Sequence, residues 1–192
     1  MGLSFHYKGQ IKEAKMLAPL VTDVIDFAKA HSFDYQTDVF EQAFPEGELT
    51  DYLGDDQLYG IAFSPKECEP IYLTFVRNGR LCSPIQLVIQ TSPEDDFFYL
   101  ISTKTQYAGA EAHALVIDFL RYLSEKYFSE FELQDEGKYW ETQDKNLLIA
   151  EFDKLQRSID RLSAMTEMMP RKEGESLEDF IKRMAEETRK KL

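Results

Sequence analysis

The sequence predicts an α+β protein, in which an antiparallel β-sheet of about six strands is backed by helices and followed by a C-terminal helical extension. Short segments with the apolar alternation of strands follow one another between about residues 57 and 107. Longer segments with apolar residues every three or four positions lie mainly before and after that block. Strands in succession with segregated helices favour an antiparallel sheet. The expected order is one strand, one helix, five strands and three helices.

The first half of this order begins with "GLSFHYKGQ", where Leu3, Phe5 and Tyr7 alternate with polar residues as in a half-buried strand. His6 lies on the opposite face of that strand, where it is either solvated or lines a groove. Residues 16 to 30 predict an amphipathic helix, followed by a short strand at about 35 to 40 and an acidic loop. "LYGIAFS" predicts the next strand.

The stretch "IYLTFVRNGRLCSPIQLVIQ" predicts a β-hairpin around Asn78-Gly79. A three-residue loop, Arg77 to Gly79 with Gly79 left-handed, keeps the apolar residues of both strands on one face. This register pairs Phe75 with Leu81, Leu73 with Ser83 and Ile71 with Ile85. Pro84 cannot donate a ladder hydrogen bond and indicates an edge or an irregularity. "FFYLISTKTQY" is apolar on both faces and predicts a central strand.

Three helices are expected after the sheet. The first covers residues 110 to 127, and the second covers about 142 to 169 with Thr142 or Asp144 as N-cap. The last covers about 176 to 191, where Ser176 and Asp179 resemble a capping box. The second helix carries an apolar seam of heptad-like spacing, made of Leu148, Phe152, Leu155, Ile159 and Leu162. We therefore expect an α+β core domain at 1–140 and two C-terminal helices at 141–192, packed on the core or on a partner.

Charge and composition exclude several classes of function. The 192 residues carry a net charge of −13. Lys29 and Lys66 enclose an interval with no Lys or Arg, in which eight Asp and Glu residues fall. No basic cluster suited to phosphates is present, so nucleic-acid binding is not expected. No apolar run is long enough for a membrane span, and the N-terminus lacks an apolar leader, which together indicate a cytoplasmic protein.

No cofactor or metal is expected. The chain is long enough to bury a core without one, and the nucleotide-binding, hydrolase and zinc motifs with diagnostic glycine, histidine or cysteine spacing are missing. The predicted strand register places Cys68 and Cys82 too far apart for a disulfide, so we expect two free thiols.

A candidate site centres on His113, at the start of the helix that follows "STKTQY". The helix dipole disfavours a charged imidazole there, which leaves a neutral ring able to accept a proton, or else a hydrogen-bonded structural histidine. Lys104 and Gln106 lie nearby in sequence. If residues 131 to 134 form a strand antiparallel to the helix, Glu136 or Glu141 can return to His113 as an acid–base or metal-binding partner.

The segment "LQDEGKYWETQD" contains the only tryptophan, Trp140, among four carboxylates. These acids fit the start of a helix, whose N-terminal end favours negative charge. The indole is then a buried structural ring whose N–H finds a partner. In the alternative, Gln106, Tyr139 and Trp140 contact a ligand beside the catalytic candidates His113, Lys104, Glu136 and Glu141.

The blocks "FHYKG", "KTQYAGAEAH" and "DEGKYWET-D" resemble segments of a group of uncharacterised bacterial proteins. That group has no assigned activity, and the resemblance implies only a bacterial, cytosolic setting.

Two functions follow from these observations. The first is a non-catalytic, acidic interaction protein, whose sheet or acidic loop binds a protein partner and whose C-terminal helices associate with a second copy. The heptad-like seam supports self-association, although the same seam can dock on its own domain. The alternative is an enzyme or small-ligand-binding protein with a site near Lys104, His113 and Glu136 or Glu141.

Overall fold

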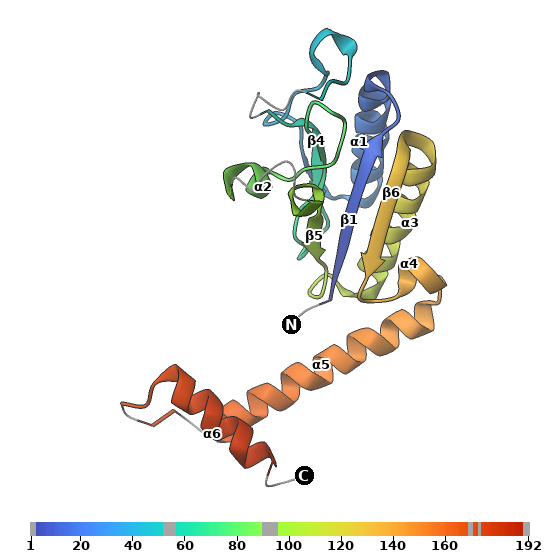
Figure 1. Ribbon diagram of the computed structural model, residues 1–192. Helices are drawn as coiled ribbons and strands as arrows, with labels where there is room; N and C mark the ends of the chain where they lie inside the picture. The colour runs from blue at the N-terminus through green and yellow to red at the C-terminus, as the bar shows by residue number, and fades with distance from the viewer. Residues whose placement is uncertain (1–2, 52–56, 90–95, 169–170, 173, 190–192) are drawn as a thin grey trace. The chain divides into compact units, whose positions relative to one another are not determined.

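A computed structural model describes residues 3–51, 57–89, 96–168, 171–172 and 174–189 of the chain. It has the α+β architecture expected from the sequence, with antiparallel strands and covering helices (Figure 1). The six strands of the described residues form two three-stranded sheets rather than one sheet. Their order along the chain also differs from the expected order, because one strand follows the second long helix and a short helix replaces a predicted strand.

The first sheet has the order β5-β1-β6, with strands at Ile101–Lys104, Ser4–Ile11 and Phe128–Asp135. Its middle strand β1 pairs antiparallel with both neighbours. Phe5 and Tyr7 are fully buried in the main core, beneath helices α1 (Leu17–His31) and α3 (Gly109–Tyr127). Figure 1 shows both helices on one side of this sheet. The even-numbered residues of β1 therefore face away from the helices.

The second sheet has the order β2-β3-β4, with strands at Asp34–Gln36, Tyr59–Ser64 and Ile71–Phe75. The expected hairpin turn follows β4 and is confirmed, since Gly79 is left-handed with φ 78° and Phe75 lies opposite Leu81. Residues after the turn also reach β1, where the Leu81 N–H donates to the Gly9 carbonyl at 2.9 Å. The segment 79–82 thus joins the two sheets.

The predicted continuation of the hairpin is wrong, because helix α2 (Pro84–Ile89) replaces the expected strand and its pairing of Ile71 with Ile85. The Gln86 side-chain oxygen accepts the Ser83 N–H at 2.7 Å, as the side chain at position N3 of a capping box does. The Gln86 N–H in turn donates to the Ser83 carbonyl at 3.1 Å. Pro84 has no N–H to lose and fits the first helical position. Local capping therefore outweighs the strand-like alternation of apolar residues.

The strand predicted from "FFYLISTKTQY" is shorter than expected and is not central. Its first part is the 3₁₀ turn η3 (Asp96–Tyr99), and β5 lies at one edge of its sheet. Phe98 and Tyr99 are buried in a small second core with Leu58, Val76 and Cys82. Phe97 points outward and is 69% exposed. The run is apolar at consecutive positions because a tight turn places Phe98 and Tyr99 in a core and leaves Phe97 on the surface.

Helices α1 and α3 are joined by one carboxylate and by stacked rings. Asp23 Oδ2 accepts hydrogen bonds from the hydroxyls of Tyr122 and Tyr127, each at 2.8 Å, and from Lys126 Nζ at 2.7 Å. Burial raises the pKa of Asp23, but these donors outweigh it and the net pKa is lowered. The rings of Phe27 and Phe119 stack with centroids 3.7 Å apart. These contacts fix two neighbouring helices on the same side of the sheet.

Three further helices complete the chain: α4 (Tyr139–Thr142), α5 (Lys145–Met168) and α6 (Leu177–Arg189). Asp144 caps α5 as expected, accepting the Asn146 N–H at 2.8 Å. Ser176 caps α6 as expected, accepting the Asp179 N–H at 3.1 Å. The chain divides into two compact units, Met1–Phe152 and Asp153–Leu192. This division lies within α5, whereas the sequence suggested a boundary at residue 140.

The apolar seam of α5 has two parts. Leu148 is 1% exposed and packs in the main core, with Phe152 partly buried against it. Leu155 and Ile159 continue the seam in the second unit and are half-buried. The side chain of Leu162 lies outside the described residues. The first part of the seam therefore covers the chain's own core.

Tyr7 makes a testable contribution to stability where the two sheets meet. Its hydroxyl donates to the Tyr72 carbonyl at 2.8 Å and accepts the Tyr72 N–H at 3.0 Å. Tyr7→Phe leaves both backbone groups without this partner, and we expect a loss of about 1–3 kcal/mol in the free energy of unfolding, measured by urea denaturation. Tyr107→Phe, at a ring that is 70% exposed, is the control and should change stability little. Equal effects of the two substitutions would contradict this role.

Candidate functional site

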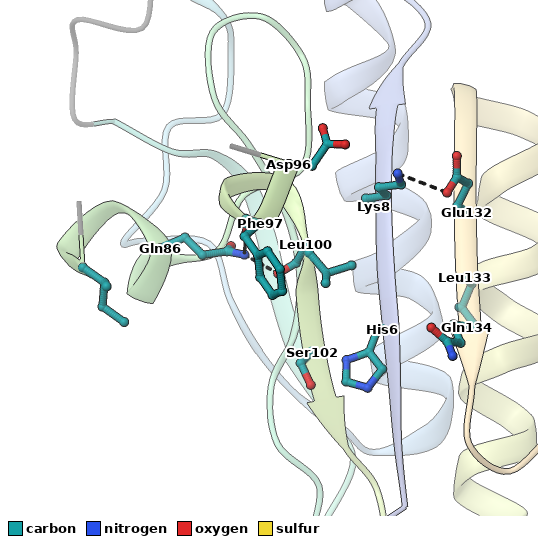
Figure 2. A pocket seen from close by; sticks show the side chains of 11 residues that line it. His6, Lys8, Gln86, Asp96, Phe97, Leu100, Ser102, Glu132, Leu133 and Gln134 are labelled. Carbon is teal, nitrogen blue, oxygen red and sulfur yellow. Dashed lines mark hydrogen bonds and ion pairs between the residues drawn. The ribbon is translucent and has the colours of Figure 1, made fainter. Parts of the chain in front are cut away.

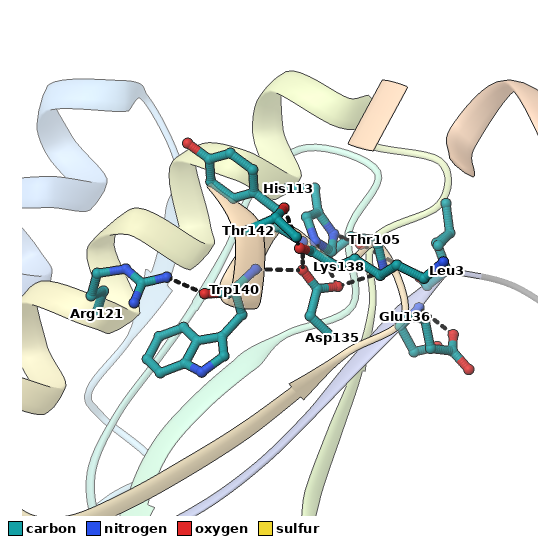
Figure 3. A network of polar contacts seen from close by, with 12 residues as sticks. Leu3, Thr105, His113, Arg121, Asp135, Glu136, Lys138, Trp140 and Thr142 are labelled. Atoms are coloured by element: carbon teal, nitrogen blue, oxygen red, sulfur yellow. Dashed lines mark hydrogen bonds and ion pairs between the residues drawn. The ribbon is translucent and has the colours of Figure 1, made fainter. Parts of the chain in front are cut away.

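His113, the centre of the site expected from the sequence, lies inside the protein. It sits on the second turn of α3 and is 0% exposed. Its Nδ1 lies 2.7 Å from Thr105 Oγ1, and its Nε2 lies 3.0 Å from Asp135 Oδ1 (Figure 3). The ring also packs edge-on against Phe5 and Phe152. The imidazole thus connects the end of β5 to the end of β6.

Asp135 organises the turn that leads from β6 into α4. Its carboxylate accepts the backbone N–H groups of Gly137 at 2.7 Å, Tyr139 at 2.8 Å and Trp140 at 3.1 Å. Burial raises the pKa of Asp135, but His113 and the backbone donors outweigh it, so the net pKa is lowered. The acidic residue that meets His113 is therefore an ionised cap.

Thr105, His113 and Asp135 are arranged in the order of a nucleophile, a base and an orienting acid. A nucleophile must meet its substrate, however, and Thr105 is 1% exposed. Gly137 closes the site further, since a Cβ there would lie 2.6 Å from Leu148 and 3.1 Å from His113 Nε2. The geometry supports a sealed structural network, which holds three chain segments together.

Lys104, Glu136 and Glu141 do not converge on His113. Lys104 lies opposite Ser4 in the β1–β5 register. Glu136 accepts the Ser4 N–H at 2.8 Å and points away from the imidazole (Figure 3). Glu141 is exposed on α4. Asp135 occupies the position that the sequence argument gave to Glu136 or Glu141.

The three expected ligand contacts also have separate surroundings. Gln106 is half-buried, and its Oε1 has no hydrogen-bond partner among the described residues. Tyr139 is buried and donates its hydroxyl to Asp118 at 3.2 Å. The Arg121 guanidinium lies 4.3 Å from the centre of the Trp140 ring and also donates to the Trp140 carbonyl. The Trp140 ring is half-buried and also lies against Phe131, and its expected ligand contact stays a prediction.

A different feature has the geometry of a binding site. A hollow of about 860 Å³, which we call the sheet groove, lies on the face of β5-β1-β6 opposite the helices (Figure 2). Its floor comes from the outward positions of three strands, and one wall comes from α2 and η3. The lining residues are His6, Lys8, Gln86, Ile89, Asp96, Phe97, Leu100, Ser102, Glu132, Leu133 and Gln134. His6 therefore lines a groove, one of the two alternatives drawn from the sequence.

The floor of the sheet groove follows the strand register. His6 lies opposite Ser102 on one side and Gln134 on the other. One pleat along the strands, Lys8 forms an ion pair with Glu132 at 3.2 Å. Neighbouring side chains on one sheet face stand about 5 Å apart, so the first row offers adjacent imidazole, hydroxyl and amide groups. This row can exchange hydrogen bonds with a ligand in both directions.

The wall of the sheet groove is apolar and faces solvent. Phe97 is 69% exposed and Ile89 is 64% exposed, both beside the polar floor. Gln86 fixes this wall, because its amide donates to the carbonyls of Phe97 and Leu100. The arrangement is suited to binding.

No protein-family model, curated protein or solved structure matches the chain. In the described part of the chain, no group of three His, Cys, Asp or Glu residues is placed to hold a metal ion. None of the helices there is both long and apolar enough to cross a bilayer.

The Asp135 network makes stability depend on pH. The folded-state pKa of Asp135 is lowered below 3.8. The ionised carboxylate therefore contributes fully to the free energy of unfolding above about pH 5, and this contribution is lost as the pH falls from the unfolded-state pKa through the folded-state pKa. We expect Asp135→Asn to lower the free energy of unfolding by about 3 kcal/mol at pH 7, because the buried backbone N–H groups of the turn lose a charged acceptor. Guanidinium denaturation from pH 7 to pH 3 should show the wild type and the variant converging.

Asp26→Asn, at an exposed residue of α1, is the control. Its free energy of unfolding should depend on pH as that of the wild type does. A constant difference between wild type and Asp135→Asn from pH 7 to pH 3 would show that Asp135 is not the titrating group.

Proposed function

We propose that the protein is a non-catalytic interaction protein, whose sheet groove holds a segment of a protein partner. The observation that carries this proposal is the exposed apolar wall of Phe97 and Ile89 beside a polar floor. Aromatic and aliphatic side chains that remain exposed beside a hollow are typical of protein-binding surfaces. Two free cysteines support a reducing compartment, and we place this function in the cytoplasm.

The shape and chemistry of the sheet groove favour a peptide segment as the ligand. The hollow is open to solvent, and its volume of about 860 Å³ is near the upper end of the range for ligand sites. Peptide backbones need both donors and acceptors, which Ser102, His6 and Gln134 supply in one row. The enzyme alternative has less support, because its candidate residues do not meet in one site. Lys104 and Glu136 both lie beside Ser4 at the end of β1, whereas His113 is fully buried in the core.

Self-association is the second part of the proposal and concerns the second unit by itself. Arg183 holds the start of α6 by two bonds to the Glu175 carboxylate, at 2.7 Å and 2.8 Å. Phe180 is 8% exposed, whereas Leu177 and Ile181 are 62% and 57% exposed on one face of α6. A helical unit of this size buries too little apolar surface to be stable alone. A second copy offers the same face and can cover it by symmetry.

The sheet groove can be tested with a random library of 12-residue peptides displayed on phage. Peptides selected against the full chain should contain a large apolar residue and should bind about tenfold more weakly to Phe97→Ser, because that ring loses roughly 1.5 kcal/mol of burial. Fluorescence anisotropy measures the affinities. Tyr107→Ser removes a ring of matching exposure, 70% against 69%, outside the groove lining. Equal weakening by both variants would refute the groove as the binding site.

Self-association can be tested by sedimentation velocity of the full chain at tens of micromolar. We expect a dimer that dissociates in the double variant Leu177→Ser, Ile181→Ser, since both side chains lose apolar burial. Ile149→Ser, at a residue of α5 that is 43% exposed, is the control and should remain dimeric. A wild-type monomer would remove self-association from the proposal.

A further inference from the structure

Helix α2 carries a second apolar surface that continues from the sheet groove. Ile85, Val88 and Ile89, which we call the α2 ridge, are 64%, 80% and 64% exposed. Gln86 and Ile89 line the sheet groove on one side of this helix. Pro84, Leu87 and Val88 line a second hollow of about 540 Å³ on the other side. The α2 ridge therefore stands between two hollows, both open to solvent.

Two more exposed apolar side chains of the first unit line the hollows on either side of this ridge. Val39, 64% exposed, lines the second hollow, and Phe97 lines the sheet groove. Together with the α2 ridge they are five of the eleven large apolar side chains exposed in the described residues. Isolated exposed apolar residues are ordinary, but several that line two hollows beside one helix are typical of an interaction surface. A ligand that crosses α2 would cover all five.

The charge of the residues near the second hollow indicates the chemistry of the ligand. The second hollow is built partly from residues 36 to 40, within the interval that has no Lys or Arg. Six acidic residues of that interval are described, and all six are exposed: Asp34, Asp38, Glu41, Glu46, Glu48 and Asp51. Among the described residues none of them has an ion-pair partner. Within the described residues no ion pair neutralises these six carboxylates, so the surface that carries them has a negative potential.

Repulsion between like charges disfavours two candidate occupants of this surface. A second copy would bring the same six acids against this side, and a nucleic acid would bring phosphates. A segment with basic side chains is instead attracted to it, and its apolar side chains find cover on Val88 and Phe97.

We infer that the partner supplies a segment with large apolar residues flanked by Lys or Arg, which runs from the sheet groove across the α2 ridge into the second hollow. This inference rests on the proposed function and names the chemistry of its ligand. The apolar side chains cover the α2 ridge, Val39 and Phe97. The basic side chains lie near Asp34, Asp38 and Glu41.

The same 12-residue phage library provides the probe. Peptides selected by the full chain should carry a net positive charge as well as apolar residues, and their affinity should fall severalfold as NaCl rises from about 50 to about 300 mM. Val88→Ser should weaken these peptides about tenfold. The triple variant Asp34→Asn, Asp38→Asn, Glu41→Gln should weaken them at least threefold, as measured by fluorescence anisotropy.

A matched triple variant, Asp26→Asn, Glu125→Gln, Glu141→Gln, removes the same charge from exposed residues of α1, α3 and α4 and should leave affinity within twofold. Selected peptides that lack basic residues but still depend on Phe97 would overturn this inference and preserve the proposed function. Basic peptides that respond equally to both triple variants would overturn it as well, since attraction would then be non-specific. Selection of no peptide at all would overturn both.

Discussion

The backbone hydrogen bonding of β1 is the constraint on which the rest of the structure depends. This strand pairs with β6 along one edge and, along the other, first with β5 and then with the segment 79–81. Tyr7 holds Tyr72 of β4 near the point where the partner changes. Because strand residues alternate between faces, this pairing sends Phe5 and Tyr7 into the core and His6 and Lys8 into the sheet groove.

Long amphipathic elements could be predicted from the sequence because burial on one face imposes their periodicity. Helices α1, α3 and α6 follow from this pattern, and the caps Asp144 and Ser176 were recognised from their positions. Helix α2 could not be predicted from periodicity, since Ile85, Leu87 and Ile89 alternate as in a strand. The deciding signal is local: Ser83 followed by Pro84 and Gln86 is a helix start.

The candidate site was harder to predict, for two physical reasons. Strand alternation continues to the end of β6, so Asp135 faces inward with Leu133 while Glu136 faces outward. The short Asp135 side chain also accepts backbone N–H groups of the turn that follows it. A sequence argument that looks only for acidic residues near His113 does not detect this capping geometry. The sheet groove depends on tertiary folding, because three strands supply its floor while α2 and η3 supply its wall. Of the residues on this floor, the sequence indicates only His6, on the strand face opposite Phe5 and Tyr7.

The buried Thr105–His113–Asp135 network and the sheet groove involve the same three strands, β5, β1 and β6, on opposite faces of their sheet. Thr105 follows β5, Asp135 ends β6, and the Thr105 N–H bonds to the Leu3 carbonyl just before β1 at 3.0 Å. His113 links the first two, so the strand ends that support the floor are tied to α3. A floor held in this way loses little conformational entropy when a ligand binds, which raises affinity without further contacts. Under the proposed function, the buried histidine therefore contributes to binding by holding the strands that carry Ser102, His6 and Gln134 in register.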